Sequence, residues 1–285
     1  MRRAVGAPLL VTGLVVAVLT PLVLLAVWAV TETWRYPALW PQAFDDRALR
    51  VVTDPGSTIL PGLVTSAGIA ATVAVVSCAI GLAAGRALGL HTFPGRGLVR
   101  FALLAPVIVP GITVSLGIQV VFIRYHLTDT VHGVVLAHLI PATPYATLVL
   151  AAAYTRLDTA FEDQARVLGA GPLRVLLHVT LPALRPALTV ALMLTFLISW
   201  NEYVLTLLIG GGSVSTLPLL LFSAIGSGDT SVAAALAMVV SIPPLLFVGV
   251  TARALTGPGA GRNDGRADPG MHPGAGATLA GLGRA

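Results

Sequence analysis

Long apolar runs dominate the pattern of hydrophobic and polar positions along this chain. Seven stretches carry no Asp, Glu, Lys or Arg: residues 4–31, 55–85, 101–123, 133–155, 186–201, 203–228 and 230–252. A helix that crosses a bilayer needs about 20 predominantly apolar residues, and most of these stretches have that length. The pattern therefore predicts an all-α polytopic membrane protein.

The two stretches that flank Glu202 decide the number of crossings. We expect one helix to run through Glu202, over residues 187–209, and to end at Gly210-Gly211-Gly212-Ser213, because glycines have low helix propensity and permit loop backbone. The apolar segment 216–225 is too short to span and is expected to be re-entrant or interfacial. The prediction is therefore six transmembrane helices.

The arginines set the expected orientation. Six crossings place both termini and two loops on one side, which then carries 13 of the 17 arginines; the other side carries Arg35, Arg47, Arg50 and Arg124. Cytoplasmic loops are rich in basic residues, so both termini are predicted to be cytoplasmic. A seventh crossing would move the four tail arginines outside and weaken this asymmetry.

These expectations divide the chain into segments. Residues 1–31 form a first transmembrane helix; this apolar run is longer than that of a signal peptide, and no clean cleavage site follows it. Residues 32–56 form an extracytoplasmic loop whose aromatic residues suit the membrane interface. Residues 57–255 form the transmembrane core, which contains a cytoplasmic loop over 156–186. The Gly- and Pro-rich tail, 256–285, is expected to be disordered.

Composition narrows the function classes. The chain is 56% hydrophobic and 10% charged, with a mean hydropathy of +0.89; a soluble domain has about 25% charged residues, so a water-soluble enzyme and a disordered chain are both excluded. All 17 basic residues are Arg. Without Lys, the chain has no Walker A loop, Schiff-base Lys or Ser-x-x-Lys pair. The net charge of +5 is spread between apolar runs and does not indicate nucleic acid.

Catalytic, metal and cofactor sites are not predicted. The single cysteine, Cys78, allows no intrachain disulfide. His126, His132 and His138 recur every six residues, which does not place them on one helical face, and there is no His-Glu-x-x-His. A membrane-embedded hydrolase would need a nucleophile–base motif that is not seen.

The glycines and prolines within the apolar runs suggest packing features. Ser66-x-x-x-Ala70 and Gly81-x-x-x-Gly85 permit close approach of helices, although such spacings arise often by chance in a glycine-rich chain. Prolines within the expected spans predict kinks that bundle packing tolerates; they are Pro106, Pro110, Pro141, Pro144, Pro243 and Pro244.

The loop between the fourth and fifth predicted helices is expected to form a helical hairpin beside the membrane. Asp158 or Thr159 can cap a first helix, which Gly169 ends. Pro172 suits the first turn of a second helix, and Pro182 is expected to end it. Apolar residues recur at helical spacing, at Leu157, Phe161, Ala165, Leu168, Leu173, Leu176 and Leu177. One face of the hairpin can pack on its own bundle while the charged face contacts a partner.

The hairpin also carries a recognisable motif, composed of Asp163-Gln164-Ala165, Gly169-Ala170, Leu181-Pro182 and Pro186. It resembles the EAA loop of ABC importer permeases, the inner-membrane subunits of binding-protein-dependent transport systems with the type I importer fold. In that family a Glu-Ala-Ala triplet precedes Gly at this spacing, and the short coupling helix docks in a cleft of the ATPase subunit. This chain has Asp163 for the Glu and Gln164 for the first Ala, with Glu162 one residue earlier.

The resemblance, weaker over residues 60–255, implies a transport subunit without its own ATPase site or cofactor. It implies ATP-binding subunits, a second permease subunit (identical or different), an extracytoplasmic solute-binding protein and a multi-pass location in the bacterial inner membrane. The implied ATPase-coupling residues are Glu162, Asp163, Gln164, Ala165, Arg166, Gly169, Ala170, Leu181, Pro182 and Pro186. Whether Glu162 or Asp163 contacts the ATPase stays open.

Glu202 is the one acidic residue within an expected span. Because an ionised group in hydrocarbon is costly, its carboxylate should face the bundle interior or a water-filled cavity. Asn201, Glu202 and Tyr203 then line a substrate path; alternatively, Glu202 is bonded to a neighbouring helix or is solvated near the outer surface. An ion-coupled secondary transporter using Glu202 is the alternative function, although such folds usually show two similar halves, and no repeat is evident.

The stretch over 200–221 bears on the substrate. With Thr216-Leu217-Pro218 it resembles the permease branch that handles polyamines, thiamine, iron and phosphonates. Glu202 and the acidic residues of the outer loops suit a cation, so a polyamine-like solute is expected.

Overall fold

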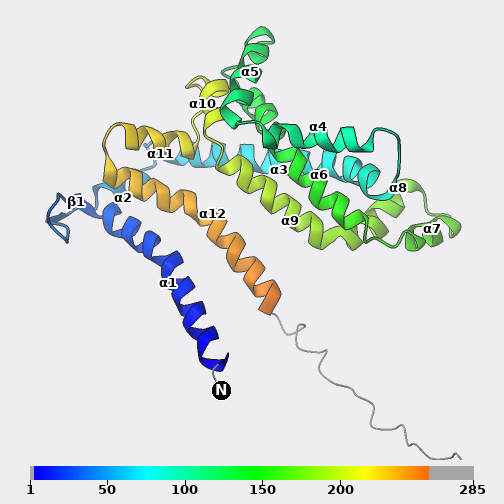
Figure 1. The fold of residues 1–285 in the computed structure, drawn as a ribbon. Coiled ribbons are helices and arrows are strands. Elements are labelled where there is room, and N and C mark those ends of the chain that lie inside the picture. The colour runs from blue at the N-terminus through cyan, green and yellow to red at the C-terminus, as the bar shows by residue number, and fades with distance from the viewer. Residues whose placement is uncertain (1–2, 257–285) are drawn as a thin grey trace, which may run out of the picture. The chain divides into compact units, whose positions relative to one another are not determined.

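The computed structural model describes residues 3–256, which are predominantly helical (Figure 1). In chain order the elements are α1 (Arg3–Ala29), β1 (Thr31–Thr33), β2 (Ala43–Phe44), α2 (Arg47–Thr53), α3 (Ile59–Leu90), α4 (Arg96–Ile108), α5 (Gly111–Arg124), α6 (Val131–Tyr154), α7 (Ala160–Val167), α8 (Pro172–Val175), the π-helical turn η1 (Leu176–Thr180), α9 (Leu181–Trp200), α10 (Val204–Gly210), α11 (Leu217–Gly226) and α12 (Thr230–Thr256). The chain divides into two compact units, Met1–Leu245 and Leu246–Ala285. The first unit holds the features described below; of the second, the end of α12 is described.

Several helices can cross a membrane. Within the described residues, four are long and apolar enough: Ile59–Leu90, Val131–Tyr154, Pro172–Trp200 and Thr230–Phe247. The bent pair α4–α5 makes a fifth if it counts as one crossing, and Leu19–Ala29 in α1 and Leu217–Gly226 are shorter apolar helices. The predicted helical, multi-span protein is confirmed, whereas the count of six stays a prediction. The predicted tail lies outside the described residues apart from Thr256.

The stretch expected to be one span over 101–123 is two helices. α4 and α5 meet at an angle of 101°. Val109 has extended backbone with ψ 137°, and Pro110 follows it. The ring of a proline disfavours helical backbone in the residue before it, so the helix ends at this dipeptide and restarts at Gly111. Pro110 therefore breaks the helix where a kink was expected.

The expectation of one helix through Glu202 is wrong. α9 ends at Trp200 and α10 begins at Val204. Asn201 Nδ2 donates to the Leu197 carbonyl at 2.9 Å, and the Glu202 Oε1 accepts the N–H of Leu205 at 3.1 Å. Both side chains satisfy backbone groups that a helix break exposes, so they compete with a continuous helix.

The predicted end of this region at the glycine run is confirmed. α10 ends at Gly210, and Gly211 has φ +52°, the left-handed conformation that ends many helices.

Pro182 does not end the second hairpin helix, because Pro172–Trp200 is continuous. The N–H of Leu181 donates to the Leu176 carbonyl, five residues back, in the π-helical turn η1. Pro182 follows in the first turn of α9, where its missing N–H is accommodated. The hairpin is thereby joined to α9 without an intervening loop.

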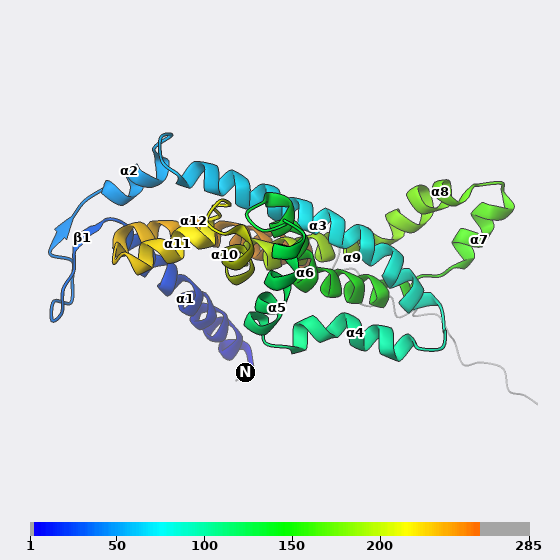
Figure 2. The ribbon, with the colours of Figure 1, turned by 90° about the horizontal axis from the view of Figure 1, so that it is seen from above.

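Three helices, α3, α6 and α9, pack along one another (Figure 2). The close approach of α3 and α6 depends on glycine. A Cβ added at Gly85 would lie 2.9 Å from the Ala151 nitrogen, and one at Gly89 would lie 2.7 Å from the Ala151 carbonyl oxygen. The Gly81/Gly85 spacing, which by chance alone would mean little, marks a true helix contact.

Ser66 of the other small-residue pair has a different role. Its Oγ accepts the N–H of Leu217 at 2.7 Å. This bond ties the start of α11 to α3.

The outer loop, predicted over 32–56, contains the β1–β2 hairpin and α2. Arg47 Nη2 pairs with Asp229 Oδ1 at 2.7 Å, which joins α2 to the turn before α12. Trp28 and Trp34 stack with ring centroids 4.9 Å apart. The loop is thus held to the rest of this unit by specific contacts.

Candidate functional site

Two regions contain the residues that the sequence singled out. The first is the α7–α8 hairpin, which lies beyond the end of α6 (Figure 2). Thr159 holds the N-cap position of α7 without a capping bond from its side chain, and it is the Asp158 Oδ1 that accepts the N–H of Ala160, at 3.0 Å. Gly169 has φ +87° in the turn that follows, as a glycine helix stop requires.

Glu162 is buried at the base of the hairpin, with 1% of its surface exposed. Its Oε1 accepts from Arg86 Nη1 at 2.8 Å and from the Thr180 hydroxyl at 2.6 Å. Its Oε2 accepts from Arg86 Nη2 at 2.5 Å and from Arg166 at 3.2 Å. The carboxylate therefore joins α7 to α3 and to η1.

The charge of Glu162 is stabilised by these partners. Hydrogen bonds from Arg86, more than any other interaction, lower the pKa of Glu162 to about 2; the Thr180 bond and the two arginine charges act in the same direction, against the effect of burial. The Arg86 guanidinium also lies 5.7 Å from the centroid of the Tyr154 ring. Glu162 is thus ionised at neutral pH and fully engaged within its own chain.

Asp163 and its neighbours face outward. The Asp163 side chain is 65% exposed and pairs with Arg166 at 2.7 Å. Gln164 and Gly169 are exposed, and Ala165 and Ala170 are half-buried. Of the two acidic residues of the hairpin, Asp163 is the one accessible to another protein.

The prediction that an apolar face of the hairpin packs on the bundle is wrong for most of its members. The exposed apolar surface of the hairpin consists of Phe161, Val167, Leu168, Leu173 and Leu177. Leu168 is 88% exposed. A groove of about 490 Å³ lies beside it, lined by Gly169, Gly171, Pro172, Leu173, Arg174, Leu177 and His178. An apolar surface of this kind is typical of a protein contact.

The remaining predicted coupling residues lie in α9, away from this surface. Leu181 and Pro182 are half-buried in its first turn. Pro186 is exposed and lines a separate cavity of about 360 Å³ with Arg156 and Leu157. The structure therefore separates the ten motif residues into seven on the hairpin, of which Glu162 is buried, and three in the first turns of α9.

The second region is the break between α9 and α10. Glu202 lines a cavity of about 260 Å³ between this break, the α4–α5 bend and α6. Ser115 and Pro141 line it too. Of the predicted substrate-path residues only Glu202 lies there, because Asn201 turns back to α9 and Tyr203 stacks on Phe222 with centroids 4.2 Å apart.

His138 of α6 bridges the two helix ends at the same break. It is 1% exposed; its Nδ1 lies 2.9 Å from the Ser199 hydroxyl and its Nε2 lies 3.0 Å from the Thr206 hydroxyl. One hydroxyl donates to the neutral ring and the other accepts from it. This bridge links α6 to the end of α9 and to α10.

Sequence reasoning missed Arg86, Thr180 and the contacts of His138. A signal for Arg86 was present, because it is the one charged residue in the stretch 55–90 and a charge in an apolar helix needs a partner. Nothing comparable marks Thr180, which donates to a carboxylate 18 positions away.

Comparison with known proteins finds a matching family and relatives that are permease proteins of transport systems. Residues 78–259 match the family described as binding-protein-dependent transport system inner membrane component. Over 211 residues the chain is 28% identical to the putrescine transport system permease protein PotI of Escherichia coli (strain K12), covering 72% of this chain and 70% of that protein. Over 198 residues it is 29% identical to the trehalose transport system permease protein SugB of Mycobacterium tuberculosis (strain CDC 1551 / Oshkosh), covering 68% and 72%.

The fold also has a counterpart among solved structures. A chain in the crystal structure of a bacterial ABC transporter involved in the import of the acidic polysaccharide alginate matches with a TM-score of 0.69 and 17% sequence identity, covering 89% of this chain and 96% of that chain. At this identity the match concerns the fold alone.

Proposed function

The chain belongs to the family of binding-protein-dependent transport system inner membrane components, and from that premise we propose that it is the permease subunit of an ATP-driven importer whose α7–α8 hairpin couples transport to a separate ATPase subunit. It is a multi-pass inner-membrane protein with the permease fold. Its partners in this proposal are two ATP-binding subunits, a second permease subunit and an extracytoplasmic solute-binding protein.

The exposed apolar surface of the hairpin is the observation that carries the coupling role. Phe161 and Leu168 lie open to solvent, while Glu162 beneath them is bound to α3 and η1. Coupling requires that the ATPase site and the transport path shift the same conformational equilibrium. A hairpin that docks on the moving ATPase must therefore be rigidly joined to the helices of the transport path. In this proposal Asp163 contacts the ATPase and Glu162 transmits the movement.

The expected topology fits the same arrangement. We take α1, α3, the bent α4–α5 pair, α6, the continuous helix Pro172–Trp200 and α12 as six crossings, with both termini in the cytoplasm. The hairpin then lies on the arginine-rich cytoplasmic side, where an ATPase would bind.

The proposed solute is a small cation such as a polyamine. Glu202 opens onto the cavity between the two helix breaks, and discontinuous helices often form substrate sites in transporters. PotI, among the relatives, is named for putrescine, whereas SugB is named for trehalose, so the support for a cation comes mainly from the carboxylate. An ion-coupled secondary transporter is the less favoured function, because membership of this family implies an ATPase as the energy source.

A cysteine crosslinking scan tests the coupling role. In a Cys78→Ser background, single cysteines at Asp163 and Leu168 are expected to crosslink to the ATPase subunit of the assembled complex. A cysteine at Glu162, which is buried, should not crosslink. Tyr36→Cys is the matched exposed control, since Tyr36 is 98% exposed in the outer loop. Absence of any crosslink from the hairpin in an assembled complex would refute the proposal.

A further inference from the structure

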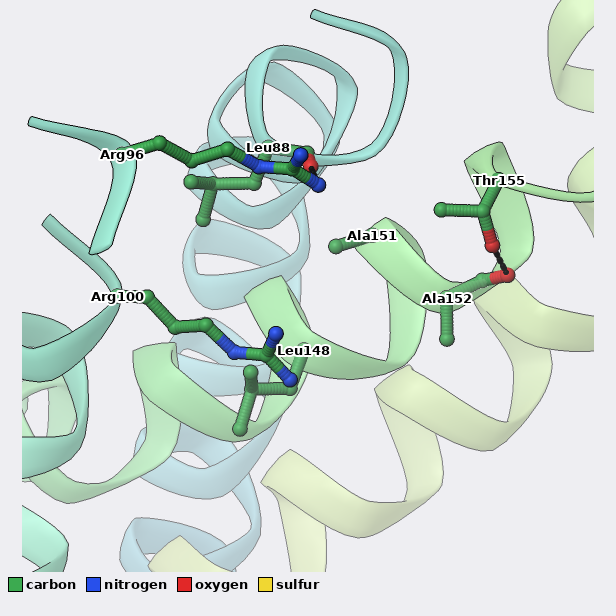
Figure 3. Close-up of a pocket in the computed structure, with 7 residues that line it drawn as sticks. All are labelled: Leu88, Arg96, Arg100, Leu148, Ala151, Ala152 and Thr155. Carbon is green, nitrogen blue, oxygen red and sulfur yellow. Dashed lines mark hydrogen bonds between the residues drawn. The ribbon is translucent and has the colours of Figure 1, made fainter. Parts of the chain in front are cut away.

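A pocket of about 260 Å³ lies apart from both regions described above, between the end of α3, the start of α4 and the last turns of α6 (Figure 3). Its lining residues are Leu88, Arg96, Arg100, Leu148, Ala151, Ala152 and Thr155. None of them is acidic, and none belongs to the hairpin or to the Glu202 cavity. A pocket with two arginines and otherwise small or apolar walls suits an anion that carries an apolar part.

The two arginines lie one turn apart on the same face of α4. Figure 3 shows both side chains extending from α4 across the pocket toward α3 and α6. Arg96 Nη2 donates to the Leu88 carbonyl at 2.5 Å. Within residues 3–256, the exposed Arg100 guanidinium makes no hydrogen bond or ion pair. Like charges at this spacing repel each other, and a bound anion would relieve the repulsion.

The surroundings indicate what kind of anion fits. Leu88 and Leu148 form apolar walls of the pocket, and α4 exposes Leu98 at 72% and Phe101 at 62% on faces turned away from the two arginines. A helix with arginines on one face and large apolar side chains on another is typical of the membrane interface. Basic pockets between transmembrane helices on the cytoplasmic side bind lipid headgroups.

We propose that the Arg96–Arg100 pocket binds the phosphate of an anionic phospholipid from the cytoplasmic leaflet. The two guanidinium groups donate to the phosphate, with Arg100 free to make more of these bonds because Arg96 already donates to the Leu88 carbonyl, and the acyl chains leave the pocket along Leu88 and Leu148. This site goes beyond the transport function and needs neither the ATPase nor a solute. A soluble phosphate ester presents the same anionic group as the lipid, and the experiment below distinguishes the two ligands.

Native mass spectrometry of the full-length chain tests the site. The chain is extracted from membranes that contain phosphatidylglycerol and phosphatidylcholine, and the retained lipids are counted. The wild type is expected to retain phosphatidylglycerol in preference to phosphatidylcholine, and Arg96→Gln/Arg100→Gln to reduce that retention on the order of tenfold. Because Arg100 has no protein partner to lose, Arg100→Gln alone should preserve the fold and still reduce retention about threefold to fivefold.

The control removes the same charge elsewhere on the proposed cytoplasmic side. Arg174→Gln/Arg185→Gln changes two exposed arginines outside the pocket and should leave retention unchanged. Equal retention by wild type and pocket variants would overturn the proposal, as would equal losses in the pocket and control variants. Displacement of phosphatidylglycerol by millimolar inorganic phosphate or glycerol phosphate would overturn the lipid assignment in favour of a soluble phosphate. Since no transport is measured, these outcomes are independent of the importer proposal.

Discussion

Glu162 lies in the first turn of α7 and Glu202 lies at the break between α9 and α10, and their carboxylates have opposite roles. Glu162 accepts bonds from two arginines and a threonine and is 1% exposed. Glu202 accepts one backbone N–H and faces a cavity, and no ion pair forms with it in the described part of the chain. A carboxylate whose lone pairs are all engaged serves the architecture, whereas one with open lone pairs can bind a ligand.

The comparison also separates the two sites by location. The Glu162 network joins the hairpin to the bundle, while Glu202 lies between two interrupted helices, α4–α5 and α9–α10. In an importer the first position suits transmission of movement, and the second suits brief contact with a solute.

Removing the Glu162 carboxylate should have the largest effect. Glu162→Ala leaves Arg86 partly buried without its partner and leaves the Thr180 hydroxyl without its acceptor. We expect a loss in the free energy of unfolding on the order of 3 kcal/mol. Denaturant or detergent titration of the purified chain measures it.

The control for this variant is Asp163→Ala. It removes the adjacent exposed carboxylate and should change stability by about 0.5 kcal/mol or less, as for a surface pair. Equal losses for the two variants would contradict the structural assignment of Glu162.

Glu202→Gln should leave stability nearly unchanged and instead reduce uptake of a cationic solute at least about tenfold, because the amide retains an acceptor for Leu205 but lacks the charge. Uptake into vesicles that contain the assembled transporter, driven by ATP, measures the effect. Asn201→Ala is the matched control, since Asn201 points away from the cavity. Normal uptake by Glu202→Gln would remove Glu202 from the proposed path.

Acid should weaken the Glu162 network by a smaller amount. Because the folded-state pKa of Glu162 is lowered to about 2 from 4.5, the network contributes its full stability above the unfolded-state pKa. That contribution is lost as the pH falls from 4.5 toward 2, and the loss amounts to about 1 kcal/mol by pH 4. The free energy of unfolding, measured between pH 7 and pH 4, checks this prediction. In Glu162→Gln, the part of its pH dependence that is due to the Glu162 carboxyl should be lost. A pH slope identical in both proteins would contradict it.

Local sequence signals predicted where helices end better than which distant residues meet. Gly169 and the Gly210–Gly212 run each end a helix by their own backbone preference, so they were predictable. The Arg86–Glu162 pair joins positions 76 residues apart and depends on how α3 packs against the hairpin. No local pattern specifies such a contact.

The missed helix breaks have a related cause. The apolar pattern around Glu202 and Pro110 is continuous, and hydropathy alone therefore predicts unbroken spans. What ends the helices is competition from side-chain bonds at Asn201 and Glu202 and from the ring of Pro110. The resemblance to the EAA loop located the hairpin but did not indicate which acidic residue is buried, because both candidates are adjacent in sequence.

Thr206→Val should produce the smallest effect, at the Glu202 break itself. The Thr206 hydroxyl lies 3.0 Å from His138 Nε2 and donates to the Glu202 carbonyl at 3.1 Å. Valine keeps the shape of threonine but removes both interactions. We expect a loss of about 0.5–1 kcal/mol in stability. If the His138 bridge positions Glu202, solute uptake should also fall a few fold through a raised KM while ATP hydrolysis by the complex is unchanged. Ser199→Ala, which removes the other hydroxyl, should behave alike; a loss of stability in both variants with unaltered KM would mean that the bridge only holds the fold and that Glu202 is positioned by its own bond to Leu205.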